Sequence, residues 1–242
     1  MKKIFFVIIS LAMMNGYCFG YDNIEIKNQN DKDSYSLGYQ YGDILKKQDW
    51  KIDPGIFSRG VSDGFRSKDP LLKAEEMKES LLSIRKRIAA TQQRKFQEES
   101  IKNYHEGKTF LDKNGKKEGV QTLKSGLQYK ILADGMGRKP ESGDIVTVHY
   151  RGTFIDGTEF DSSYARGKSE TVQMNSLIQG CGEALHLMKE GSKWQLFIPP
   201  ELAYGQSGQG SRIPPNSTLI FEIELIRIED AGNKNSKLRQ NY

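Results

Sequence analysis

The feature that most constrains this chain is a run of 36 residues, from 71 to 106, that contains neither glycine nor proline. A single helix across this run would be roughly 54 Å long. Four apolar residues in its first half recur at spacings of four, three and four: Met77, Leu81, Ile84 and Ile88. This period predicts a packed helix face. Beyond Ala90 the run is mostly polar and typical of a solvated spacer; the alternative is two helices with a break near 91–93.

Two shorter helices are predicted before this run. The first extends from Asp31 to Gln48, and one side of it carries Tyr35, Gly38, Tyr41, Gly42 and Leu45. Glycine weakens a helix, so its use here indicates close approach of another helix; a frayed helix without a partner is the alternative. The second begins at Asp53-Pro54, an N-cap followed by proline, and extends to Phe65. Two such helices bury too little to fold alone and need the next helix or a second copy of the chain.

Residues 1–20 have the composition of a secretory signal peptide. Lys2 and Lys3 are followed by a mostly apolar stretch from Ile4 to Met14 and then by small residues. That stretch is shorter than the roughly 20 residues that span a bilayer; an N-terminal anchor is the alternative. Cleavage after Gly20, or after Gly16, would place the mature protein in the periplasm, with the outer membrane or cell surface as further destinations. No other stretch is apolar enough to cross a membrane.

Charge and cysteine content narrow the function classes. The net charge is only +5, and no basic stripe is interleaved with aromatic residues, so the sequence does not favour nucleic-acid binding. Signal cleavage would leave Cys181 as the only cysteine, which excludes an internal disulfide. Stability must then come from core packing and from dimerisation.

The second half of the chain predicts an α+β domain. Residues 107–126 contain turn signals and are expected to form a loop. Apolar alternation then predicts strands near 127–131, 146–150, 194–198 and 219–228. A short amphipathic helix is expected from Leu177 to Met188. Several strands and one helix indicate an antiparallel sheet wrapped on that helix; residues 231–242 are expected to be a disordered tail.

Most catalytic constellations are missing from this sequence. The three histidines, at 105, 149 and 186, are scattered, and His149 is expected to be an exposed strand residue. The glycine-rich run 205–210 is not followed by a helical pattern, which favours a flap-like loop over a phosphate site. Neither a metal nor a cofactor is therefore expected. What remains is a concentration of aromatic and apolar residues beside turns.

Three separated motifs carry a resemblance to a known family. They are Val146-Thr147-Val148-His149-Tyr150-Arg151-Gly152 with Asp156-Gly157-Thr158-Glu159-Phe160-Asp161-Ser162-Ser163, then Leu202-Ala203-Tyr204-Gly205, then Ile213-Pro214-Pro215-Asn216 through Leu225. In this order they resemble the FKBP-type peptidyl-prolyl cis-trans isomerases. The resemblance implies a noncovalent isomerase that binds proline-containing polypeptides and macrolide-type ligands.

The resemblance also implies which residues form the site. The catalytic pocket would be made by Tyr150, Phe160, Asp161, Tyr204 and Phe221. Substrate contacts would come from Arg166, which orients Asp161, and from Val172, Leu177, Ile178, Cys181 and Ile213. At the start of the short helix, Leu177 and Ile178 would present an apolar side chain and a backbone N–H. For each of these residues the alternative is ordinary core packing.

Two positions depart from the family pattern. The family usually has a tryptophan at the floor of its pocket, where this chain has Cys181 in the segment Ile178-Gln179-Gly180-Cys181. A thiol leaves the floor deeper, so we expect weaker prolyl binding and reduced activity. The flap carries Gln209 and Arg212, which changes the polar rim and leaves substrate preference open.

The upstream helices resemble the exported Mip/FkpA branch of this family, in which two helical N-terminal domains intertwine as a homodimer. The expected order is a signal peptide at 1–20, a dimerisation domain at 21–90, spacer and linker at 91–120 and an isomerase domain at 121–230. A chaperone activity is expected beside catalysis. One alternative is a dimeric chaperone or surface interaction protein with a weak pocket; another is a purely structural adhesin.

Overall fold

The computed structural model describes residues 24–47 and 50–229; the expected signal peptide and C-terminal tail lie outside these residues. The chain divides into two compact units, residues 1–78 and 79–242. This boundary lies inside the longest helix, whereas the sequence placed the end of the helical domain at 90. The elements are α1 (Gln29–Lys47), α2 (Pro54–Phe65), α3 (Ala74–Asn114), β1 (Val120–Thr122), β2 (Gln128–Ala133), β3 (Ile145–Phe154), β4 (Glu159–Ser162), β5 (Glu170–Gln173), α4 (Gln179–Leu187), β6 (Lys193–Ile198) and β7 (Leu219–Glu229).

The two helices of the first unit form close to where the sequence predicted them. Asp53 caps α2 as expected, because its side chain accepts a hydrogen bond of 2.9 Å from the N–H of Ile56. α1 contains no buried residue, and Asp63, which pairs with Arg59, is the buried residue of α2. Most apolar side chains of this unit are therefore solvent-exposed within a single chain.

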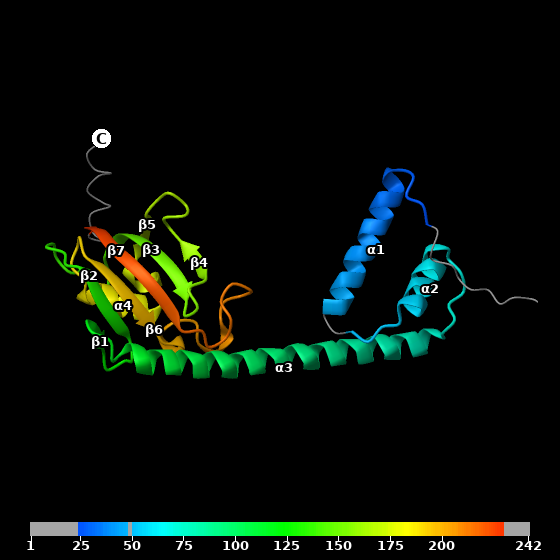
Figure 1. Ribbon diagram of the computed structural model, residues 1–242, viewed down its shortest axis with the longest axis horizontal. Coiled ribbons are helices and arrows are strands. Elements are labelled where there is room, and N and C mark those ends of the chain that lie inside the picture. The colour runs from blue at the N-terminus through cyan, green and yellow to red at the C-terminus, as the bar shows by residue number, and fades with distance from the viewer. Residues whose placement is uncertain (1–23, 48–49, 230–242) are drawn as a thin grey trace, which may run out of the picture. The chain divides into compact units, whose positions relative to one another are not determined.

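The long helix α3 is continuous, so the alternative of a break near 91–93 is wrong (Figure 1). It also continues through Gly107, where a loop was expected, and ends at Asn114. Gly107 is tolerated because it lies against the sheet domain: an added Cβ would come within 2.2 Å of Thr218 Oγ1. The last turns of α3, from Gly107 to Asn114, therefore pack within the second unit, whereas most residues from 91 to 106 are exposed.

The second unit is built on an antiparallel sheet with the order β1-β2-β6-β7-β3-β4, and β5 pairs with the other part of β3. β3 and β7 are the long central strands, and α4 lies against the sheet (Figure 1). Their inward-facing residues form the core, including Val146, Val148, Leu219 and Leu225. The predicted α+β fold is confirmed.

An irregularity in the sheet explains why the apolar alternation along β7 changes phase near its end. The pairing of β3 with β7 shifts between Thr147 and Val148, so that Ile226 is 39% exposed while Ile228 is 9% exposed. This bulge is where the alternation along the last strand loses its phase. β1, β4 and β5 were not predicted, since they are three or four residues long.

His149 differs from its predicted role as an exposed strand residue. It is half-buried, its Nδ1 lies 2.9 Å from Ser163 Oγ, and its ring stacks on Tyr164 with centroids 4.5 Å apart. The Ser163 hydroxyl also bonds to the backbone of Tyr150. His149 therefore helps to fix the turn that follows β4.

Among the described helices, none combines the length and apolar character that a bilayer-spanning helix would need.

Candidate functional site

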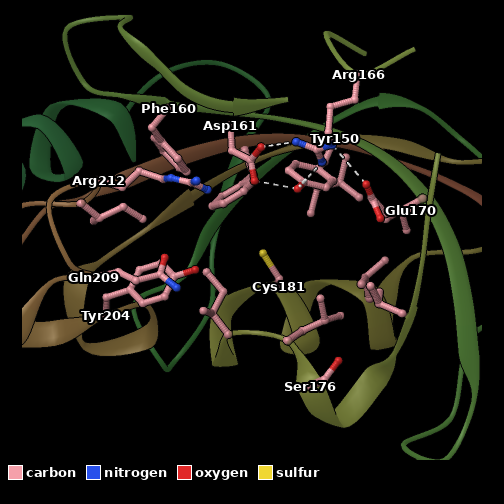
Figure 2. Close-up of a pocket in the computed structure, with 18 residues that line it drawn as sticks. Tyr150, Phe160, Asp161, Arg166, Glu170, Ser176, Cys181, Tyr204, Gln209 and Arg212 are labelled. Atoms are coloured by element: carbon pink, nitrogen blue, oxygen red, sulfur yellow. Dashed lines mark hydrogen bonds and ion pairs between the residues drawn. The ribbon is translucent and has the colours of Figure 1, made fainter. Parts of the chain in front are cut away.

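A cavity of about 650 Å³ opens between the sheet, α4 and the loop that follows β6 (Figure 2). All eleven residues singled out from the sequence line it. Gln209 and Arg212, expected at the polar rim, also line it. Five further lining residues were not expected: Val148, Glu170, Ser176, Leu185 and Ile223. Val148 and Ile223 could have been found from strand alternation, because they share a face with Tyr150 and Phe221.

One wall of the pocket is aromatic. Phe160 meets Phe221 edge to face, with ring centroids 5.5 Å apart and an interplanar angle of 81°, and Tyr150 lies 6.2 Å from Phe221. Edge-to-face contact is a favoured geometry for such rings. Gly152 makes this wall possible, because an added Cβ would lie 2.6 Å from Phe160 and 3.0 Å from Phe221.

The floor is formed by the first turn of α4. Cys181 is 5% exposed, and its sulfur points toward the aromatic wall (Figure 2). Burial raises the pKa of its thiol to about 12, so the group is neutral at pH 7 and behaves as a small apolar side chain. Gly180 lets α4 approach the sheet closely, since an added Cβ would lie 2.5 Å from Ile198 Cγ2.

The polar side of the pocket is a hydrogen-bonded group of four residues. The Tyr150 hydroxyl donates to Asp161 over 2.7 Å, and Arg166 donates to Asp161, to the Tyr150 hydroxyl over 2.8 Å, and to Glu170 over 3.2 Å (Figure 2). Arg166 also lies over the Tyr150 ring, 5.5 Å from its centroid. The Asp161 carboxylate is thus held in one orientation at the pocket edge.

The electrostatics of this group follow from those contacts. Burial alone would raise the pKa of Asp161, but hydrogen bonds from Tyr150 and Arg166 hold it below its ordinary value. Burial, followed by the bond to Asp161, raises the pKa of Tyr150. At neutral pH the pocket therefore presents a carboxylate and a neutral phenol beside a dry aromatic surface.

The loop after β6 supplies the opposite side. Tyr204 is half-buried, and desolvation is the main cause of its raised pKa. Gly208 turns the chain at φ 63°, and Gln209 and Ile213 then pair as an isolated bridge. Ile213 is 2% exposed and lines the cavity, while Gln209 and Arg212 form its rim. The run 205–210 begins with a short 3-10 helix at Gly205–Ser207 and reaches the pocket mouth at Gln209.

The arrangement can hold a compact apolar ring and a flanking amide. Its interior is mostly apolar; the Asp161 and Glu170 carboxylates lie on one side with the Tyr150 hydroxyl, and Tyr204 lies on the opposite side. The described residues contain no cluster of three or more His, Cys, Asp and Glu side chains that could hold a metal ion. Binding and orientation are the chemistry that this geometry offers.

Two family models match the chain. Residues 136–226 match the FKBP-type peptidyl-prolyl cis-trans isomerase model, and residues 30–131 match the domain amino terminal to FKBP-type peptidyl-prolyl isomerase. The first region covers the sheet domain from residue 136 onward, and the second covers the helices before it together with β1 and part of β2.

Comparisons over most of the chain identify relatives of the same family. The chain is 41% identical to the outer membrane protein MIP of Legionella longbeachae over 96% of this chain and 99% of that protein. It is 38% identical to the FKBP-type peptidyl-prolyl cis-trans isomerase FkpA of Escherichia coli over 87% of this chain and 80% of that protein. The crystal structure of Escherichia coli FkpA matches with a TM-score of 0.71 and 38% identity, over 86% of this chain and 100% of the FkpA chain.

Proposed function

Because this chain belongs to the FKBP-type peptidyl-prolyl cis-trans isomerases of the Mip/FkpA kind, we propose that its pocket accelerates Xaa-Pro rotation in exported proteins by noncovalent, desolvating binding. Support comes from the convergence of all eleven expected site residues on one cavity. An isomerase needs no nucleophile and no proton transfer, and the pocket provides a dry aromatic surface with few polar groups.

The physical task is to lower a rotation barrier. The peptide bond resists rotation by about 18–20 kcal/mol, because resonance keeps it planar. A twisted amide loses that resonance and is less polar, so an apolar pocket disfavours the planar ground state relative to the transition state. Each tenfold acceleration requires about 1.4 kcal/mol of such selective binding.

Each part of the pocket has a role in this proposal. Phe160, Phe221 and Tyr150 would enclose the prolyl ring. The Tyr204 hydroxyl and the backbone N–H of Ile178 would donate to substrate carbonyls, and Asp161 would lie beside the twisted amide. Leu177, Val172 and Ile213 would complete the apolar edge.

A prolyl isomerisation assay on the mature protein tests this assignment. We expect Tyr204→Phe to lower kcat/KM by about fivefold, the value of one hydrogen bond, and Asp161→Ala to lower it as well. Tyr164→Phe is the matched control, because the Tyr164 hydroxyl bonds to Glu224 and Tyr164 does not line the pocket. Equal kcat/KM in the unsubstituted protein and in all three variants would overturn the assignment.

We also propose a chaperone activity, a homodimer and export to the periplasm or outer membrane. The exposed apolar side chains of α1 and α2 support binding of unfolded chains and of a second copy. The outer membrane name of the Legionella relative supports export. The alternative is a chaperone with an inactive pocket, and Cys181 at the floor makes this alternative worth testing. It would be favoured if prolyl isomerisation stayed at the uncatalysed rate while the protein still suppressed aggregation of an unfolded client.

A further inference from the structure

We propose that Arg212 makes this pocket select prolines that lie next to an acidic residue of the substrate chain. The inference rests on the proposed function, and it names the substrate class of the same site. It follows from the charges that line the cavity and from the way in which each is paired.

The charged residues on the sheet side of the pocket are already paired with one another. Arg166 bonds to Asp161 and, over 3.2 Å, to Glu170, so its cation lies between two carboxylates. Asp161 also accepts a bond from Tyr150. A charged substrate side chain would have to compete with these bonds.

Arg212 is different. It is exposed, it lines the cavity, and it forms no ion pair with any residue of the described chain. Its backbone N–H donates to the Gln209 carbonyl over 3.2 Å, which ties its position to the rim loop. Figure 2 shows its side chain extending from that loop into the pocket mouth, on the side of Phe160. The guanidinium is therefore available to a ligand.

Arg212 and Tyr204 line the same cavity. Burial is the main cause of the raised pKa of Tyr204, Cys181 and Asp161 raise it further, and Arg212 makes the smallest contribution, in the opposite direction. Tyr204 is also the proposed donor to a substrate carbonyl. Because Tyr204 and Arg212 line one cavity, a side chain that flanks the bound proline would lie near the guanidinium.

Guanidinium recognises carboxylates with well-directed, charge-assisted hydrogen bonds. A Glu or Asp next to the proline would gain such a contact, whereas a Lys there would be repelled. The interaction is at the solvent-exposed rim, so it should be modest and screened by salt. It should discriminate between substrates without being required for turnover.

A peptide series tests the proposal directly. Peptides that differ only in the residue before proline, as Glu, Gln or Lys, are compared in a protease-free isomerisation assay, and a second series varies the residue after proline. In at least one series we expect kcat/KM for Glu to exceed that for Gln by about two- to fivefold at low salt. Raising the ionic strength should reduce this ratio.

Charge variants assign the effect to Arg212. Arg212→Gln should abolish the preference, and Arg212→Glu should reverse it in favour of Lys. Lys124→Gln is the matched control, because it removes an exposed cation of the same unit that does not line the pocket; its Glu-to-Gln ratio should equal that of the unsubstituted protein.

The outcomes separate this inference from the function on which it rests. Turnover with equal ratios in the unsubstituted protein and Arg212→Gln would overturn the inference and leave the isomerase assignment intact. If no peptide were turned over, titration of the same peptides by NMR would decide the question: tighter binding of Glu peptides that is lost in Arg212→Gln supports selection, and equal binding overturns it.

Discussion

Gly152 is the residue on which the aromatic wall depends most directly. Its missing Cβ would lie 2.6 Å from Phe160 and 3.0 Å from Phe221, and ring atoms cannot approach a methyl group so closely. We expect Gly152→Ala to displace both rings, to cost about 1–3 kcal/mol of folding free energy and to lower kcat/KM by tenfold or more. Gly157→Ala has open space around it but a φ of 89°. Gly157→Ala should therefore lower the folding free energy without a comparable loss of kcat/KM.

Cys181 gives a prediction with the opposite sign. It is buried at the floor of a cavity of about 650 Å³, where its family usually has a tryptophan. A large aromatic residue can supply about 150–250 Å² of contact surface. Cys181→Trp should therefore raise kcat/KM on a prolyl peptide, while Cys181→Ala should not. A folded Cys181→Trp protein with unchanged or lower activity would contradict this account of the floor.

The lowered pKa of Asp161 links this residue to stability at acid pH. A carboxyl group whose pKa is lower in the folded state stabilises the fold above its unfolded pKa, about 3.9, and loses that contribution as the pH falls through the folded value. The midpoint temperature of thermal unfolding should therefore fall as the pH is lowered below about 4. Asp161→Asn should lose part of this acid dependence, and an identical pH profile in the variant would show that the carboxylate contributes nothing.

At the scale of elements, α3 is joined to the loops that form the pocket. Asn216 has a φ of 52°; its side chain donates to Ser100 Oγ over 2.8 Å, and its backbone N–H donates to the Gly205 carbonyl over 2.8 Å. Gly205 follows Tyr204 directly, and Asn103 also donates to the Pro215 carbonyl over 2.9 Å. One residue thus connects the helix to the loop that carries Tyr204.

A double-mutant cycle measures this connection. Ser100→Ala and Asn216→Gly each remove one partner, and glycine keeps the positive φ accessible. We expect a coupling of about 1 kcal/mol in unfolding free energy and a shared increase in KM, because the loop is less well positioned. Ser83→Ala, at an exposed position of α3, is the control. If the effects of the two substitutions on unfolding free energy and on KM were strictly additive, α3 would not position the pocket loop.

Elements could be predicted from sequence where the periodic signal was long. The two central strands and α2 follow from alternation and from the Asp53-Pro54 cap. The strands of three or four residues could not be predicted, because so few residues give no period. Gly107 was misread for a tertiary reason: its space is filled by Thr218, far away in the sequence.

The pocket residues, too, could be predicted from sequence only where they belong to local motifs. Its aromatic residues belong to motifs and were identified together. Glu170 and Arg212 reach the pocket through the pairing of β5 with β3 and through the bridge between Gln209 and Ile213. The contact of Glu170 is not encoded locally, so this residue could not be assigned from the sequence, whereas Arg212 was expected at the polar rim from its place beside Ile213.

At the scale of the whole molecule, the first unit is incomplete as a single chain. Phe65 is 89% exposed, Ile56 75% and Tyr35 63%. Such a set of exposed apolar side chains marks an interaction surface. The proposed homodimer through the N-terminal helices would cover it, and light scattering of the mature protein should give twice the chain mass.

Gly38 and Gly42 decide between a single chain and a dimer, because the two predict opposite signs. Among residues 24–47 and 50–229, nothing lies within 4 Å of a Cβ added at either position. If α1 were solvated, Gly→Ala at either site would stabilise it by up to about 1 kcal/mol. If a second copy packs closely there, the same change would destabilise the unit and weaken association. We expect the second result in thermal unfolding and in light scattering across a dilution series. Gln40→Ala, on the other side of α1, is the control, and stabilisation by Gly38→Ala and Gly42→Ala would place the dimer contact elsewhere.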